Sequence, residues 1–382
     1  MSPPPPIFLA SENDPAALNL KITEVAKQKI AFLNQHAKAV WSEVKKCRAD
    51  MLEGESVNGF DFSGHRFICS RTHVWLELSD QQIGKGTSFT ARVGLDILNG
   101  RTIVIKEANP TERAQRNAKR HIEKTAQFSP GAPYAMHDLE NGSFQSPRSK
   151  RHVTVVLQEH APDLLKIMLN GGLKTGEERV QAIVDIANSI NYLHNNKHQV
   201  NGDIKLINIG FKGDGIYVVA DNDTLCSPNN PSFQQRPRGT IPYLAPEVLC
   251  RQREVQAGQK PWTSTVGYGV DLWSFGIVIL QIYRINPPWY LTWKTMEDVE
   301  NAIPEFVRNQ TYRQGMPEEL YPLLDGLFKI DPKERITISR AIEILAHIQN
   351  PSQVPLPEGD QTLPLPPTEN IDDQFTTDDQ PA

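Results

Sequence analysis

Apolar positions in residues 19–52 recur at roughly helical spacing, with lysine and glutamate between them. Residues three and four apart share one face of a helix, so the stretch is predicted to be amphipathic and helical. Its apolar positions are Ile22, Val25, Ile30, Phe32, Leu33, Val40, Trp41, Val44 and Met51. The apolar face of such a helix is stable only when it packs against another part of a protein. Either the helix packs on the neighbouring domain, which we favour, or it binds a partner.

Strand patterns follow, until about residue 160. Asn99-Gly100 is a strong hairpin signal between two such segments. The predicted strands are 73–78, 87–98, 101–107 and 153–158. One helix interrupts them at 110–128, where Asn109-Pro110 and Glu112 favour a helix start.

The pattern turns helical from Thr175. Residues 179–194 are amphipathic, residues 270–282 read as a buried helix, and residues 339–348 form a last helix. A β-rich half followed by a helical half predicts an α+β fold of two lobes with a cleft between them.

Composition narrows the class of protein. With 382 residues and 39% hydrophobic positions, the chain can bury a sizeable core. The net charge is 40 basic minus 45 acidic residues, or −5, which argues against general nucleic-acid binding. No apolar run approaches the ~20 residues of a membrane span, and Met1-Ser-Pro-Pro-Pro-Pro does not start a signal peptide. Four scattered cysteines, expected to be idle thiols, favour an intracellular, cytoplasmic location; secretion into a host cell is left open.

Both ends differ from the middle of the chain. Residues 1–18 are rich in proline, and residues 351–382 hold seven prolines and seven acidic residues without lysine or arginine. Both are predicted to be disordered. Pro364-Leu-Pro-Pro leaves a polyproline-binding partner open, and the basic loop 148–152 leaves an acidic-patch partner open. A solvated tail and a solvated turn are the favoured interpretations.

The densest chemistry lies at Asn201-Gly-Asp203-Ile-Lys205-Leu-Ile-Asn208. Asp203 can accept the proton of an attacking hydroxyl, and Lys205 can hold a phosphate. Asn208, and Asp221 after an apolar strand, supply the oxygen ligands that Mg²⁺ prefers.

Two earlier motifs suit a nucleotide. Gly84-Lys85-Gly86 lets a backbone approach phosphates. Lys106 ends a strand, where it can bridge phosphates and a helix carboxylate, and Glu123 is the expected partner.

In this order the motifs resemble the Ser/Thr branch of the protein kinases over residues 75–350. Gly239-Thr-Ile-Pro-Tyr-Leu-Ala-Pro-Glu247 looks like the end of an activation segment. Residues 270–276 look like the central helix of the second lobe, and Asp331–Arg335 like the last structural motif. The resemblance implies an N-lobe at 75–158 and a C-lobe at 162–350, after a helical extension at 19–55. It also implies ATP, Mg²⁺ and a protein substrate.

The resemblance also assigns the adenine pocket. Glu159-His160-Ala161 would be the hinge and Gln158 the gatekeeper. Ala91 and Val104 would line the pocket, with Gly210 where a larger residue is usual.

The sequence departs from the family at two triplets. His-Arg-Asp is Asn201-Gly202-Asp203, and Asp-Phe-Gly is Asp221-Asn222-Asp223. Asn201 and Asn222, with either Gln127 or Phe128, would place amides in a stack that is usually apolar. We hypothesise that these amides hydrogen bond to one another.

Gly202 cannot pair with a phosphorylated loop, although Arg236 and Arg238 could substitute. Activity is therefore predicted not to require activation-loop phosphorylation. Loss of activity both on phosphatase treatment and on mutation of Ser227 or Ser232 would contradict this.

Because the acids are retained, we predict an active Ser/Thr protein kinase. Asp203, Lys205, Lys106 and Glu123 would be catalytic, and Gly84, Lys85, Gly86, Ala91, Val104, Glu159 and Ala161 would bind nucleotide. The alternatives are a nucleotide-binding pseudokinase that acts as a scaffold or regulator, and a small-molecule kinase.

Overall fold

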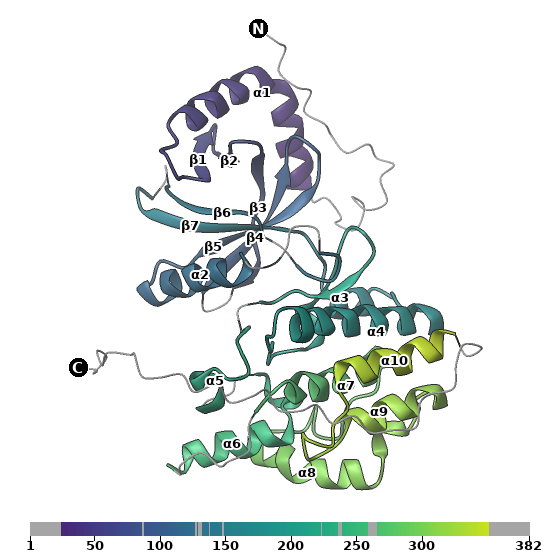
Figure 1. The fold of residues 1–382 in the computed structure, drawn as a ribbon. Coiled ribbons are helices and arrows are strands. Elements are labelled where there is room, and N and C mark those ends of the chain that lie inside the picture. The colour runs from purple at the N-terminus through teal and green to yellow at the C-terminus, as the bar shows by residue number, and fades with distance from the viewer. Residues whose placement is uncertain are drawn as a thin grey trace.

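The computed structural model describes residues 24–85, 88–126, 128, 132–136, 138–146, 149–222, 224–235, 239–258 and 266–350. The two ends predicted to be disordered, 1–18 and 351–382, lie outside these residues. Figure 1 shows a β-rich lobe above a helical lobe, as the hydrophobic pattern predicts. The described part of the chain holds no helix with both the length and the apolar character needed to cross a membrane.

The first lobe is built on one antiparallel sheet with the strand order β1-β2-β3-β4-β5-β7-β6. Its strands are β1 Val57–Phe62, β2 His65–Ser70, β3 Val74–Lys85, β4 Phe89–Asp96, β5 Thr102–Ala108, β6 Asp138–Gln145 and β7 His152–Glu159. The predicted Asn99-Gly100 hairpin joins β4 to β5, and Gly100 has a positive φ of 74°.

The sheet curls until its two outer strands touch. Ser56, just before β1, donates its hydroxyl to the carbonyl of Asn141 in β6 at 2.6 Å. Val57 of β1 and Phe144 of β6 are both buried in the same apolar cluster, which also holds Trp75 of β3 and Ile105 of β5. The lobe is therefore close to a barrel, with this cluster as its interior.

Helix α1, Glu24–Ala49, covers the outside of this sheet (Figure 1). Leu33, Val40 and Val44 are nearly inaccessible to solvent and pack against apolar side chains of β2, β3 and β4. Their spacing of seven and four residues places them on one helical face. The helix thus packs on the neighbouring domain, the favoured alternative.

A second helix, α2 Glu112–Thr125, packs on the sheet through Ala114, Ala118, His121 and Thr125. The Thr111 hydroxyl caps its start by accepting the amide of Ala114 at 3.2 Å. Between α2 and β6 the chain contacts the helical lobe. Lys212 and Ser189 of that lobe donate to the carbonyls of Pro133 and Tyr134, at 3.0 and 2.9 Å. These bonds tie the segment between α2 and β6 to the helical lobe.

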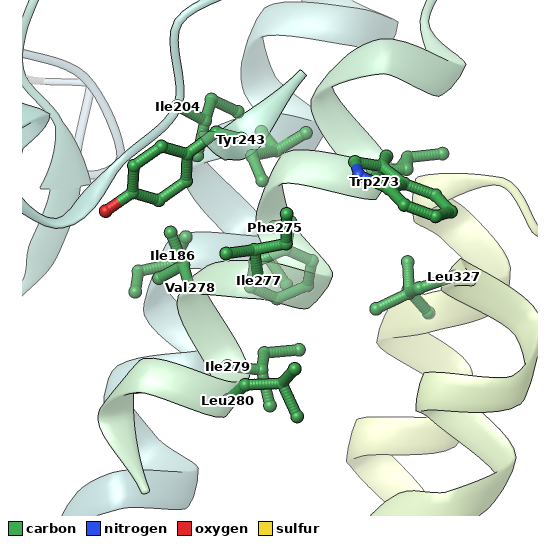
Figure 2. Close-up of a cluster of buried hydrophobic side chains, with 14 of the residues drawn as sticks. Ile186, Ile204, Tyr243, Trp273, Phe275, Ile277, Val278, Ile279, Leu280 and Leu327 are labelled. Carbon is green, nitrogen blue, oxygen red and sulfur yellow. The ribbon is translucent and has the colours of Figure 1, made fainter. Parts of the chain in front are cut away.

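The second lobe packs around α7, Gly269–Ile282, whose residues from Val270 to Ile282 are all buried. Figure 2 shows side chains of this helix reaching Ile186, Tyr243 and Leu327 on three other segments. The remaining helices are α3 Leu164–Leu169, α4 Gly176–Asn191, α5 Pro231–Gln235, α6 Pro246–Gln256, α8 Met296–Arg308, α9 Tyr321–Leu327 and α10 Ile338–Gln349. A π-helix, Tyr192–Asn196, extends α4, and two short strands, β8 Ile209–Phe211 and β9 Tyr217–Val219, pair with each other.

A buried ion pair links α6 to the segment before α10. Arg335 donates to both carboxylate oxygens of Glu247, at 2.8 and 3.1 Å, and to the carbonyl of Gly269 at 2.6 Å. Removing one partner of a buried pair typically costs about 3–5 kcal/mol, because the other charge stays buried. The structure thus joins the end of the predicted activation segment to the last predicted motif.

Candidate active site

Four polar side chains converge at the loop before β8. Lys205 Nζ donates to Asp203 Oδ2 and to Thr240 Oγ1, both at 2.7 Å. The Thr240 hydroxyl donates to Asp203 Oδ1 at 2.7 Å, and Asn208 Nδ2 lies 3.2 Å from Asp203 Oδ2. Asp203, Lys205 and Thr240 are half-buried, so the cluster is fixed by packing and remains open to solvent.

Two buried residues of the helical lobe hold this loop in place. Asp271, fully buried in α7, accepts the amides of Asn201 and Gly202 at 2.8 and 2.7 Å. The same carboxylate lies 2.8 Å from His194 Nε2 in the π-helix. The Asp203 backbone is therefore anchored to the core of the lobe.

Asn201 joins the two acidic segments of the site. Its Nδ2 donates to the carbonyl of Asp221 at 2.7 Å, and its Oδ1 accepts the amide of Asp203 at 3.0 Å. Asn222 instead donates to the carbonyl of Met136 at 3.4 Å, and its Oδ1 is buried without a partner among the described residues. The two amides do not bond to each other, contrary to our hypothesis. Gln127 lies outside the described residues, whereas Phe128 is buried in the helical-lobe core.

Gly202 takes a backbone conformation that side chains disfavour. Its φ is +75°, which costs a residue with a Cβ about 1–2 kcal/mol. Its carbonyl also approaches Gly239, where an added Cβ would meet it at 2.7 Å. The end of the predicted activation segment is thus packed directly against the catalytic loop. Arg236 and Arg238 lie outside the described residues, and Ser227 and Ser232 are exposed.

The predicted metal ligands suit a hard cation. Asn208 Nδ2 donates to the Asp203 carbonyl at 2.8 Å and to the Asp203 carboxylate at 3.2 Å. The Oδ1 atom of Asn208 has no hydrogen bond within the described residues. The half-buried Asp221 follows β9, and Asn201 holds its backbone. An amide oxygen and a carboxylate are the ligand types that Mg²⁺ prefers. No group of three or more His, Cys, Asp or Glu side chains forms a metal centre in the described ranges.

The predicted nucleotide-binding residues of the first lobe lie on adjacent strands. Gly84 and Lys85 end β3 and pair with Ala91 and Thr90 of β4. Ala91 in turn pairs with Lys106 of β5, two residues from Val104. Ala91, Val104 and Lys106 are half-buried, and Lys85 is exposed. Gly86 lies outside the described residues.

The structure does not pair Lys106 with Glu123. Glu123 is exposed on α2, and Lys106 forms no salt bridge with any residue the structure describes. The reason is the rotation of the helix about its axis. His121 and Thr125 lie on the buried face, and Glu123, two residues from each, is rotated by about 200° and so faces nearly the opposite way. The sequence-based prediction of this contact is wrong for the conformation described.

The segment after β7 passes close to β8, where a Cβ at position 210 would force its neighbours to shift. A Cβ added to Gly210 would lie 2.9 Å from Ala161 Cβ, 3.2 Å from Ala220 Cβ and 3.6 Å from Met136 Cε. Glu159 is tied to the other lobe, because its Oε1 accepts the amide of Gly213 at 2.9 Å. The space left by the missing side chain at Gly210 is thus taken up by its neighbours.

Gln158 belongs to a polar network that the sequence reasoning missed. The buried Gln158 donates to Asp138 Oδ1 at 2.6 Å, Thr125 donates to Oδ2, and His121 Nε2 lies 3.5 Å from Oδ1. Burial raises the pKa of Asp138, but His121, Thr125 and Gln158 lower it by more, so it lies below its usual range. Asp138 lies in none of the predicted strands, so the sequence pattern offered no signal for this network.

Thr240 and Asp271 are two further residues whose contacts sequence reasoning did not supply. Thr240 was read only as part of a family segment, and Asp271 only as part of a helix. A fully buried aspartate inside an apolar helix must have hydrogen-bond partners, and that was its signal.

A curled sheet joined to a helical lobe, with an Asp–Lys–Asn loop before β8, is the two-lobed architecture that the sequence resemblance implies. The protein kinase domain model matches residues 78–347, well over half of the chain. The chain therefore belongs to the protein kinase family. The match begins inside β3, so α1, β1 and β2 precede it.

Curated proteins with similar sequences are also named as protein kinases. Serine/threonine-protein kinase ppk21 of Schizosaccharomyces pombe is 28% identical over 166 residues, covering 40% of this chain and 26% of that protein. Serine/threonine-protein kinase 36 of Pongo abelii is 26% identical over 266 residues, covering 67% of this chain and 18% of that protein. Probable serine/threonine-protein kinase 2 of Plasmodium falciparum is 25% identical over 249 residues, covering 64% of this chain and 44% of that protein. The chain thus spans less than half the length of each.

Proposed function

We propose that this chain is an active protein kinase that transfers the γ-phosphoryl group of Mg·ATP to Ser or Thr hydroxyls of proteins. The observation that carries the proposal is the bonded cluster of Asp203, Lys205, Thr240 and Asn208. Phosphoryl transfer asks a protein mainly for positioning and charge stabilisation, and this cluster supplies both. The names of the relatives support serine and threonine as acceptors.

The oxygen of the substrate hydroxyl would bond to the γ-phosphorus while ADP leaves, and Asp203 would accept the proton of that hydroxyl. Lys205 Nζ lies 2.7 Å from this carboxylate, where it would also neutralise an oxygen of the moving phosphoryl group. Thr240 bonds to both residues and would keep the base aligned. Asp271 holds the loop rigid, so little reorganisation is needed at the moment of transfer.

Asn208 and Asp221 would hold Mg²⁺, which neutralises charge on the phosphates when bound. Gly84, Lys85 and Gly86 would cover the phosphates, and Ala91, Val104, Glu159 and Ala161 would enclose the adenine. Lys106 would contact the phosphates directly. Glu123 could support Lys106 only if α2 rotated, because its side chain is exposed in the conformation described.

The test is transfer of radiolabelled γ-phosphate to a generic protein substrate by wild type and Asp203→Asn. A general base contributes roughly 10²–10⁴-fold, so the variant should lose nearly all signal. Glu319→Gln, at an exposed position of the helical lobe, is the matched control and should behave as wild type. Equal transfer by wild type and Asp203→Asn would overturn the proposal.

A second function, a nucleotide-binding pseudokinase that acts as a scaffold or regulator, is favoured by one observation. Lys106 has no carboxylate partner among the described residues. This function predicts background transfer in both proteins together with thermal stabilisation by Mg·ATP. Background transfer without a nucleotide effect would indicate a role in partner binding alone.

A further inference from the structure

Two cysteines that the site does not use meet at the contact between α1 and the sheet. Cys47 lies near the end of α1 and Cys69 lies in β2, 22 residues further along the chain. Their Sγ atoms are 2.7 Å apart, and the two residues are 5% and 0% exposed. The sequence alone gives no reason to connect them.

Contacts other than the sulfurs hold the two backbones in place. Arg48 donates to the carbonyls of Ser70 and His73, at 2.8 and 3.3 Å. Asn58, which pairs with Cys69 in the sheet, donates to the carbonyl of Cys47 at 3.2 Å. The backbone beside each thiol, at Arg48 and at Ser70, is thus held across the contact between α1 and the sheet. Sulfurs 2.7 Å apart are already close to the ~2.05 Å of a disulfide bond, so the thiols need to approach only slightly to form one.

We propose that Cys47 and Cys69 form an intramolecular disulfide that fastens α1 to the first lobe. With a peroxide as oxidant, one thiol gains oxygen to become a sulfenic acid and releases one water. The other thiol then attacks that sulfur, the S–S bond forms and a second water leaves. In total, two thiols lose two hydrogens and one hydrogen peroxide is reduced to two waters.

The other two cysteines serve as internal controls. Cys226 lies in an isolated bridge with Val200, and Cys250 lies in α6, where its sulfur is 3.7 Å from a Glu254 oxygen. Both belong to the helical lobe. The pairing is therefore specific to Cys47 and Cys69.

A disulfide between Cys47 and Cys69 would stabilise the packing of α1 on the first lobe. A cross-link between residues 22 apart removes conformational freedom from the unfolded chain. The melting temperature of the oxidised protein is expected to exceed that of the reduced protein by several degrees.

The test treats the folded full-length protein with hydrogen peroxide, blocks the remaining thiols after denaturation and digests with trypsin. Cleavage at lysine and arginine should release Cys47-Arg48 joined to Phe67-Ile-Cys69-Ser-Arg71, and reduction should separate the two peptides. This readout needs no variant and does not depend on kinase activity. Recovery of four blocked thiols, or of Cys47 linked to Cys226 or Cys250, would overturn the proposal.

Variants give a second readout. Cys47→Ser and Cys69→Ser should each abolish the difference in melting temperature between oxidised and reduced protein, whereas Cys250→Ser should preserve it. An undiminished difference in Cys47→Ser would overturn the proposal even if this variant folds less well than wild type.

Discussion

Thr240 illustrates how much of the site depends on one hydroxyl. It donates to the Asp203 carboxylate and accepts from Lys205, so it joins the catalytic loop to a segment 37 residues further along the chain. Without it, the Asp203 carboxylate and the Lys205 ammonium would still pair, but neither would be hydrogen bonded to the predicted activation segment.

We expect Thr240→Val to lower phosphoryl transfer by tenfold or more and Thr240→Ser to stay within a few-fold of wild type. Valine keeps the shape and loses the hydroxyl, and hydrogen bonds to charged groups contribute about 1.5–3 kcal/mol, where 1.4 kcal/mol is tenfold in rate. Steady-state rates at saturating Mg·ATP check this. Equal rates for the two variants would show that the hydroxyl is dispensable.

Residues close together in sequence were predictable, and residues brought together by the fold were not. Asp203, Lys205 and Asn208 sit within six positions of one loop, so their spacing alone places them side by side. Thr240 and Asp271 reach the same loop from 37 and about 70 residues away. No local pattern encodes these contacts, because they depend on how the elements pack.

At the scale of elements, α2 is fastened to β6 through a carboxylate. Asp138 accepts from Thr125 of α2 and from Gln158 of β7, and His121 of α2 lies beside it. The same face of α2 therefore engages Asp138, while Glu123 points away from it. The existence of this helix was predictable from the sequence, but its rotation was not, because the buried face is decided by polar partners on other strands.

We expect Asp138→Asn to be less stable than wild type at pH 7, by roughly 1–3 kcal/mol, because its buried partners lose a charged acceptor. The folded-state pKa of Asp138 is depressed, so its contribution is present above the unfolded pKa of about 3.9 and is lost as pH falls through the lower folded value. The stability difference should therefore shrink below about pH 4.

Urea unfolding between pH 7 and pH 3 measures this difference. Asp50→Asn is the matched control, since the Asp50 carboxylate is exposed and forms no ion pair among the described residues. This control should change stability little at any pH. A gap between wild type and Asp138→Asn that stays constant across the range would contradict the role given to the charge.

For the molecule as a whole, the first lobe extends beyond the matched kinase domain. The family match starts at residue 78, yet α1, β1 and β2 contribute to the same sheet and its apolar cover. The sequence predicted the helix and its covering role. It did not predict β1 and β2, because they are short and sit next to a turn-rich segment.

Leu33→Ala is expected to lower the free energy of unfolding of the first lobe by about 2–5 kcal/mol, as for other fully buried leucines. Leu52→Ala is the control: its side chain is 68% exposed, so it should cost little. Chemical denaturation of both variants makes the comparison. If the two cost the same, α1 would not be part of the folded unit.

The contact between Ser56 and Asn141 sets an order of events during synthesis. It joins positions 85 residues apart, and β7 must pair with β5 and β6 before the curl can close. The roughly 90 residues from β2 to the end of β7 take on the order of 5–20 s to translate. Throughout that time Ile68 and Trp75, which end up inside the barrel, have no completed interior to enter. The nascent first lobe is thus a stage of synthesis at which chaperones would shield exposed apolar side chains.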